Sequence, residues 1–196
     1  MNSNQLTKLA GVILILSGIL FIVGILIHPS EENSAAMLMK NWVPAHVLLY
    51  ISCVFAMAGF IGAYDRQAEK SKGIGLLGFI LVFIGFALLT GVTFTAAFLG
   101  PIISAQAPTI IDNMSPNSAP AMLDLWSAII VGIGGIVFGI SSLKAKVYSK
   151  TSGILLILGG LGLLLGFTVI PGILGLVGVV LFGAGEIFLG NRLRKK

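Results

Sequence analysis

The chain has 196 residues, of which 57% are hydrophobic and only 10% are charged, and its formal net charge is +5 at pH 7. A soluble domain carries about 25% charged residues, so this chain lacks the polar groups to cover its own surface in water. The composition excludes a purely soluble domain and indicates a protein that is surrounded partly by lipid.

Six continuous apolar runs are each about as long as one membrane crossing. A helix that rises about 1.5 Å per residue needs about 20 apolar residues to cross a hydrocarbon core ~30 Å thick. No run carries Lys or Arg in its middle, and none alternates as a membrane β-strand would. The runs use most of the chain, so we expect one all-α transmembrane domain over residues 1–196. In chain order the predicted membrane helices cover residues 9–27, 44–64, 73–99, 122–143, 153–170 and 172–190.

The first run is interpreted as a retained helix, because it is longer than the apolar region of about 7–15 residues in a signal peptide. The polar stretch after it has the pattern of a helix start, with Ser30 as the cap and Glu31 and Glu32 in the first turn. The segment "AAMLMKNW" then predicts a short amphipathic piece on the outer membrane surface, with Trp42 as an interfacial anchor.

The two histidines of the chain flank this loop, since His28 ends the first apolar run and His46 begins the second. A hairpin of these runs would put both imidazoles at similar depth on the outer side. Four interpretations are open. The histidines tolerate the interface and do nothing more, they bind a metal with Glu31 or Glu32 as third ligand, they hold a b-type haem, or they sense pH.

Lys and Arg are distributed unevenly over the connections between the runs. Eleven lie on one side of the predicted membrane, whereas Lys40 alone lies on the other. Short loops rich in these residues stay in the cytoplasm, so we expect a cell-membrane protein with both termini cytoplasmic and the loops 28–43 and 100–121 outside. Nucleic-acid binding is not favoured, because the basic residues are scattered over several turns. The eleven are Lys8, Arg66, Lys70, Lys72, Lys144, Lys146, Lys150, Arg192, Arg194, Lys195 and Lys196.

Parts of the sequence repeat. Residues 8–29, "KLAGVILILSGILFIVGILIHP", align with residues 150–171, "KTSGILLILGGLGLLLGFTVIP", through the first Lys, three Gly and the last Pro. The K-x-x-G opening recurs at Lys72, and "NWVPAHVLLY" aligns with "NSAPAMLDLW", where His46 corresponds to Met122. Low complexity is the competing explanation, but the coincident charges and prolines favour duplication. The pattern predicts three tandem hairpins of the same orientation, at about 8–66, 72–144 and 150–191.

The glycines predict close helix packing, which lipid-embedded helices need because no hydrophobic force brings them together. Gly135-x-x-x-Gly139 and Gly162-x-x-x-Gly166 fit the pattern and would serve either packing within the chain or formation of a homo-oligomer. The single cysteine, Cys53, excludes an intrachain disulfide and a Cys-based metal motif, and it is interpreted as a small apolar residue.

Glu186 stands in the last apolar run, a few residues before Asn191. A carboxylate within a membrane is a candidate functional residue that needs a partner, and Lys144, Lys146 or Lys72 lie on the same side. Alternatively, Glu186 extends to the inner headgroups or pairs with a basic residue of the C-terminus.

Motifs typical of phosphate-binding loops, zinc proteases, redox cysteines and serine hydrolases do not occur in the sequence. The sequence favours a non-enzymatic helical bundle that binds a small ligand, lipid or protein partner at its outer face, and it identifies no cofactor. The second hypothesis is a redox protein that binds haem or metal through His28 and His46. The third is a small transporter with Glu186 as its intramembrane carboxylate. The candidate ligand-binding residues are His28, His46, Glu31, Glu32 and Trp42.

Overall fold

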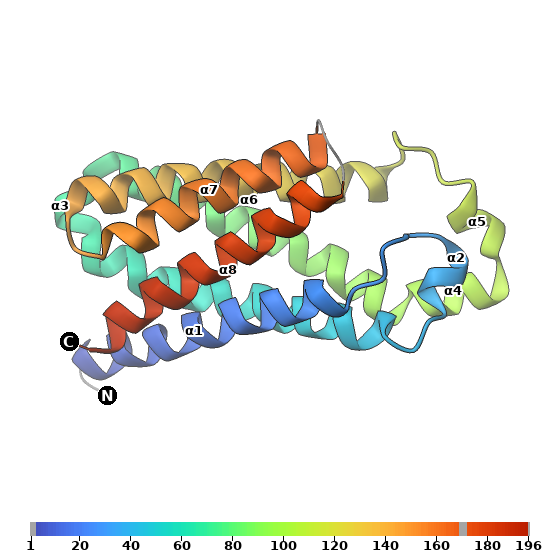
Figure 1. Cartoon of the computed structure of the whole chain (residues 1–196), viewed down its shortest axis with the longest axis horizontal. Coiled ribbons are helices and arrows are strands. Elements are labelled where there is room, and N and C mark those ends of the chain that lie inside the picture. The colour runs from blue at the N-terminus through green and yellow to red at the C-terminus, as the bar shows by residue number, and fades with distance from the viewer. Residues whose placement is uncertain (1–2, 169–171, 196) are drawn as a thin grey trace.

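The computed structural model describes residues 3–168 and 172–195 (Figure 1). Helices make up most of this part of the chain, and it contains no strand, as the continuous apolar runs predict. The helices are α1 (Ser3–Ile27), α2 (Ser34–Met37), α3 (Trp42–Phe98), α4 (Gly100–Gln106), α5 (Pro108–Asp112), α6 (Ala119–Ala145), α7 (Lys150–Thr168) and α8 (Ile173–Arg194).

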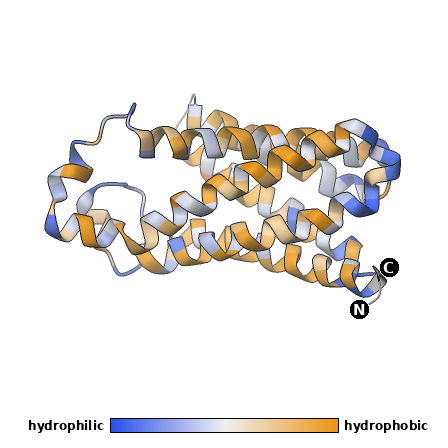
Figure 2. Ribbon diagram, turned by 180° about the vertical axis from the view of Figure 1, so that it is seen from behind, coloured by the Kyte–Doolittle hydropathy of each residue, from blue (hydrophilic) through white to orange (hydrophobic). Residues whose placement is uncertain are grey.

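Five helices in the described residues, α1, α3, α6, α7 and α8, are long and apolar enough to cross a membrane. Their outward faces carry large hydrophobic side chains such as Leu26, which is 61% exposed. Figure 2 shows apolar residues along the length of the bundle and hydrophilic residues concentrated at its two ends. This distribution suits a bundle surrounded by a lipid bilayer, as the composition predicts.

Helix α3 reverses direction at Lys72, which has non-helical φ and ψ angles of 50° and −146°. The indole Nε1 of Trp42 donates to the carbonyl oxygen of Ala96 over 2.8 Å. The Tyr64 and Phe79 rings stack with centroids 5.0 Å apart. The first arm (residues 42–71) and the second arm (residues 73–98) therefore lie side by side and antiparallel (Figure 1).

The predicted boundaries of this region need a correction. The polar stretch 65–71 lies between the predicted membrane helices 44–64 and 73–99, but in the structure it continues the first arm as helix up to the reversal. Within this stretch Gln67 is buried against α6, whereas Asp65, Glu69 and Lys70 are exposed. Similarly, the expected outer loop 100–121 contains the short helices α4 and α5.

The long helices pack in a closed ring in which α8 returns to α1. Helix α1 packs on the first arm of α3, where a Cβ at Gly59 would meet Leu14. The second arm packs on α6, where a Cβ at Gly78 would meet Phe138. Helix α7 then packs between α6 and α8. Figure 1 shows α1 starting and α8 ending at the same end, here called the terminal end, while α2, α4 and α5 lie at the opposite cap end.

A cluster of phenylalanines fills the centre of the ring. All five members are buried, and their rings meet with centroid distances such as 5.1 Å between Phe60 and Phe138 and 5.8 Å between Phe86 and Phe182. Edge-to-face contacts of this kind add to the stability that burial alone provides. The members are Phe21, Phe60, Phe86, Phe138 and Phe182, from α1, both arms of α3, α6 and α8.

Glycines allow two helix crossings to be unusually close. A Cβ atom at Gly11 would lie 2.7 Å from the carbonyl oxygen of Gly190, and one at Gly139 would lie 2.7 Å from that of Gly153. The glycine surfaces predicted from the sequence thus serve packing within the chain at these crossings. The contacting pairs are Gly11–Gly190 and Gly18–Gly183 between α1 and α8, and Gly153–Gly139 and Gly160–Gly132 between α7 and α6.

The cap end is built differently from the helix start expected there. Asn33, not Ser30, caps the four-residue helix α2, because its Oδ1 accepts the amide hydrogen of Ala36 over 2.8 Å. The amide and hydroxyl of Ser34 donate to the Asp112 carboxylate over 2.9 and 2.8 Å. These bonds hold α2 against α5 at the cap end of the bundle.

Candidate functional site

His28 and His46 lie together at the cap end, as the hairpin interpretation predicts. His28 follows the last residue of α1, and His46 is the fifth residue of α3. Their Nε2 atoms are 3.3 Å apart, and the rings meet edge to face with centroids 4.7 Å apart. The helix ends therefore aim one nitrogen of each imidazole at the other.

The second nitrogen of each ring fixes its tautomer. His28 Nδ1 lies 2.6 Å from the carbonyl oxygen of Pro29, and His46 Nδ1 lies 3.0 Å from that of Trp42. A carbonyl oxygen only accepts, so both Nδ1 atoms carry hydrogen and donate. In neutral imidazoles both Nε2 atoms then present lone pairs.

Two lone pairs face each other across 3.3 Å in this arrangement. They repel unless a proton or a metal cation lies between them. A histidine that binds metal through Nε2 and donates from Nδ1 to a carbonyl oxygen is the common arrangement in metal sites. The pair is therefore prepared to hold a cation.

Trp42 holds the His46 ring in place. Its ring centroid lies 4.2 Å from that of His46 and 5.3 Å from that of His28, and its Nε1 donates to Ala96 of the second arm. The prediction that Trp42 anchors the chain at the membrane interface is wrong, because the side chain is only 2% exposed. Its indole is buried because the second arm of α3 returns beside it and supplies the acceptor.

Neither carboxylate of the first loop joins the histidines in a three-ligand site. Glu31 Oε2 accepts a hydrogen bond from Asn33 Nδ2 over 2.7 Å, and Glu32 is exposed on the same loop. Throughout residues 3–168 and 172–195, no group of three or more His, Cys, Asp or Glu side chains is placed to hold a metal ion. The chain thus offers two ligands in this structure.

A hollow of about 280 Å³ lies at the cap end, along α2 and the loop that follows His28. It has space for a small solute or water, but neither His28 nor His46 lines it. Its lining combines polar and apolar groups from Pro29, Ser30, Glu31, Asn33, Ala35, Ala36 and Met39.

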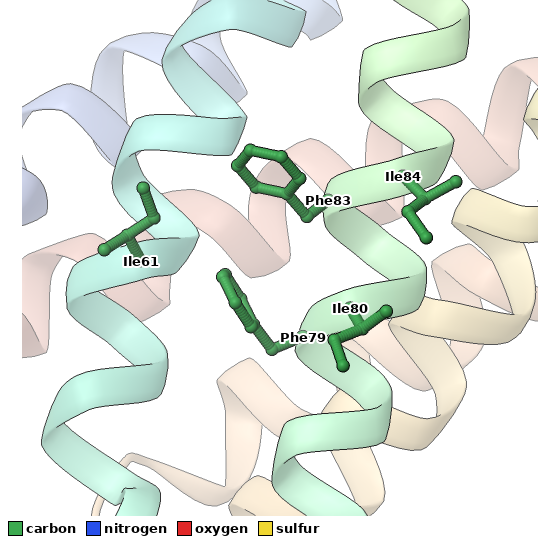
Figure 3. A pocket seen from close by; sticks show the side chains of 5 residues that line it. All are labelled: Ile61, Phe79, Ile80, Phe83 and Ile84. Atoms are coloured by element: carbon green, nitrogen blue, oxygen red, sulfur yellow. The ribbon is translucent and has the colours of Figure 1, made fainter.

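A second hollow of about 310 Å³ is apolar (Figure 3). Figure 3 shows Phe79, Ile80, Phe83 and Ile84 on the second arm of α3 and Ile61 on the first arm. None of these side chains offers a hydrogen bond or a charge, so the groove does not suit a polar ligand.

A haem does not fit between the histidines. Its iron takes two axial ligands from opposite faces of the porphyrin, so a macrocycle would have to lie between the two Nε2 atoms. Their separation of 3.3 Å and the edge-to-face contact of the rings leave no room for it. The haem hypothesis is therefore not supported by this geometry.

Glu186 is inside the bundle rather than at its surface. The side chain is 0% exposed, and its Oε2 lies 2.9 Å from Ser17 Oγ of α1. The interpretation that Glu186 extends to the headgroups is thus wrong, and its hydrogen-bond partner is a serine rather than a lysine. Cys53 is also fully buried, as expected of a small apolar residue.

Some buried polar contacts had no distinct signal in the sequence. Gln67 Nε2 donates to Ser141 Oγ over 3.1 Å, and Ser142 Oγ donates to Gln67 Oε1 over 2.9 Å. Single serines within apolar runs are common, so Ser141 and Ser142 carry no distinct signal. That Gln67 faces α6 follows only from the helical continuation of residues 65–71, which the sequence did not predict.

Comparisons of the chain with protein-family models, with curated proteins and with solved structures find no match. No activity is therefore carried over from another protein, and the function has to be argued from the side chains described above.

Proposed function

We propose that the chain is a multi-pass cell-membrane protein with six membrane-spanning helices, arranged as three tandem hairpins. The two arms of α3 supply two of these spans. Each arm is longer than the about 20 residues that one crossing requires, and Lys72 separates them. The unequal distribution of Lys and Arg supports placing the terminal end, with both termini, in the cytoplasm.

The two glycine crossings support the duplication. Gly11 and Gly18 correspond to Gly153 and Gly160 in the sequence alignment. Each pair contacts a return helix, α8 for the first and α6 for the second, through glycines that are again seven residues apart. Equivalent residues of different hairpins thus make equivalent contacts.

Cysteine labelling tests this topology. In a Cys53→Ser background, a single cysteine at Glu31 should react with a membrane-impermeant maleimide added to intact cells, and one at Lys146 should react only after lysis. The reverse pattern, or labelling of both positions in intact cells, would contradict the proposed orientation.

The bundle, we further propose, binds a divalent transition-metal ion of the zinc class between His28 and His46. One observation carries this proposal, namely the 3.3 Å between the Nε2 atoms while both Nδ1 atoms donate to carbonyl oxygens. Two histidines on a tetrahedral zinc, with Zn–N of about 2.0–2.1 Å, have their nitrogens about 3.3–3.4 Å apart.

The small number of protein ligands indicates what such a site would do. Structural zinc sites have four protein ligands and catalytic sites about three, whereas the described chain supplies two here. The other positions would be taken by water or by a small solute. Such a site suits reversible capture and release of metal at the membrane surface, which is a binding function rather than catalysis.

Metal binding can be measured directly on the protein purified in detergent. With Zn²⁺ in isothermal titration, and with Co²⁺ as a spectroscopic probe of tetrahedral coordination, we expect one ion per chain. His28→Ala and His46→Ala should each abolish binding, and Glu31→Gln serves as the matched control on the same loop. Absence of stoichiometric binding, or binding that survives both histidine substitutions, would refute the function.

The transporter hypothesis is less well supported. In the described part of the chain, five phenylalanine rings occupy the centre of the bundle, so the middle of its interior is apolar. The polar groups of the interior lie between neighbouring helices instead, as Ser17 and Glu186 do.

A further inference from the structure

The Glu186 carboxyl lies where α1, α3 and α8 meet. Ser17 Oγ lies 2.9 Å from Glu186 Oε2 and 3.0 Å from the carbonyl oxygen of Ser52. The Ser52 hydroxyl in turn donates to the carbonyl oxygen of Ser17 over 3.0 Å. One carboxyl and two hydroxyls thus form a polar cluster enclosed by apolar helices.

A count of hydrogens favours the neutral acid. The Ser17 hydroxyl has one hydrogen but two acceptors in reach, so an ionised carboxylate would leave one acceptor unpaired. If Oε2 carries a proton, it donates to Ser17 Oγ, Ser17 donates to the Ser52 carbonyl, and Ser52 donates to the Ser17 carbonyl. Every hydrogen of the cluster then has its own acceptor.

The surroundings do not favour a charge on Glu186. Within the described chain its Oε1 has no hydrogen-bond partner, and an unpaired carboxylate is costly to bury. Helix α3 contributes Ser52 and, next to it in the chain, the buried thiol of Cys53. Helix α7 contributes Leu156, which lies against Gly185 next to Glu186. None of these groups supplies a positive charge.

The equivalent position at the other glycine crossing is apolar. When α8 is aligned with α6 on their glycines, Glu186 corresponds to Gly135. When α1 is aligned with α7, Ser17 corresponds to Gly159. The Phe182 residue occupies this slot, since Cβ atoms at Gly135 and Gly159 would meet it. A crossing of this type therefore packs without a carboxyl, and only the α1–α8 crossing contains an ionisable group.

We propose that Glu186 is a proton-binding site, neutral in the packed bundle and ionised when α8 separates from α1 and water reaches the carboxyl. Proton release is thereby linked to opening of the α1–α8 crossing. The site is separate from the histidine pair at the cap end, so the two proposals stand or fail independently.

Infrared spectroscopy of the full-length protein in detergent tests the protonation state. At neutral pH we expect a carbonyl stretch of a protonated carboxyl that Glu186→Gln removes and that Glu69→Gln, at an exposed position on α3, leaves in place. Ser17→Ala should shift the frequency of this band, because it removes the acceptor of the carboxyl hydrogen. A neutral-pH spectrum without such a band would overturn the proposal.

Thermal unfolding gives a second readout. In acid the wild type and Glu186→Gln should unfold alike, and as pH rises above about 4, the ordinary range of a glutamate, the wild type should lose stability relative to the variant. The reason is that the unfolded chain releases the proton that the packed bundle keeps. A difference between the two proteins that does not change with pH would overturn the link to the crossing. If Glu186→Gln does not fold, Ser17→Ala still tests the proposal, because an unchanged infrared band in that variant would exclude the inferred hydrogen bond.

Discussion

The hydroxyl of Tyr148 donates to the carbonyl oxygen of Ala63 over 2.7 Å. Tyr148 lies in the connection between α6 and α7, whereas Ala63 belongs to the first arm of α3. This bond fastens a connection at the terminal end to a helix that lies far away in the sequence. It also encloses the phenol, which is only 9% exposed.

Removing this hydroxyl should weaken the bundle and alter its response to alkali. Tyr148→Phe is expected to lower the free energy of unfolding by about 1 kcal/mol, the usual net value of such a hydrogen bond. Burial raises the pKa of Tyr148 above its ordinary value of 10.0. The folded state thus keeps a proton that the unfolded chain releases, so stability falls as pH rises above about 10. In denaturant titrations across the alkaline range, the wild type should therefore lose more stability than Tyr148→Phe.

Substitution at a close crossing should be more damaging than at an open glycine. Gly139→Ala places a Cβ 2.7 Å from the Gly153 carbonyl oxygen, which only a shift of the helices relieves. We expect a loss of about 1–3 kcal/mol, as for other overpacked positions. Gly91→Ala is the control, because nothing lies within 4 Å of its Cβ, and it should be neutral or stabilising by up to about 1 kcal/mol. Melting temperatures that fall equally in both variants would contradict this view of the crossing.

Structural and binding roles at the cap end can be separated through Trp42. Trp42→Phe keeps an aromatic ring over His46 but removes the donor to the Ala96 carbonyl oxygen. Stability should fall by about 1 kcal/mol, while zinc binding is retained. His28→Ala should show the opposite pattern. Calorimetry with zinc and thermal unfolding of the two variants provide the comparison.

The bond between α2 and α5 is expected to depend on acid. The amide and then the hydroxyl of Ser34, by donating to Asp112, lower the pKa of this carboxyl below its ordinary value of 3.8. The contact therefore contributes above the pKa of the unfolded chain and is lost as pH falls through the lower value of the folded state. Asp112→Asn should abolish this dependence and speed hydrogen exchange of the Ser34 amide at neutral pH. Unchanged exchange in that variant would show that the contact does not hold α2 in place.

The sequence predicted the membrane bundle because long apolar runs have few alternatives. It also predicted that the two histidines lie at similar depth, because each stands next to the same connection between two consecutive apolar runs. It misplaced Trp42 and left Glu186 undecided between the interior and the headgroups, because a polar or amphipathic side chain near the end of an apolar run can lie at the interface or inside the bundle. The choice depends on partners such as Ala96 and Ser17, which lie 54 and 169 residues away along the chain.

The reversal at Lys72 couples the two arms of α3 in rotation as well as in position. A helix turns about 100° per residue, since it has 3.6 residues per turn. A flexible connection could absorb one inserted residue, but a turn with a single non-helical residue has no spare length. An insertion there would swing Phe86 away from the central phenylalanine cluster and turn a lipid-facing side chain inward. The length of this turn therefore determines which side chains of the second arm face the core.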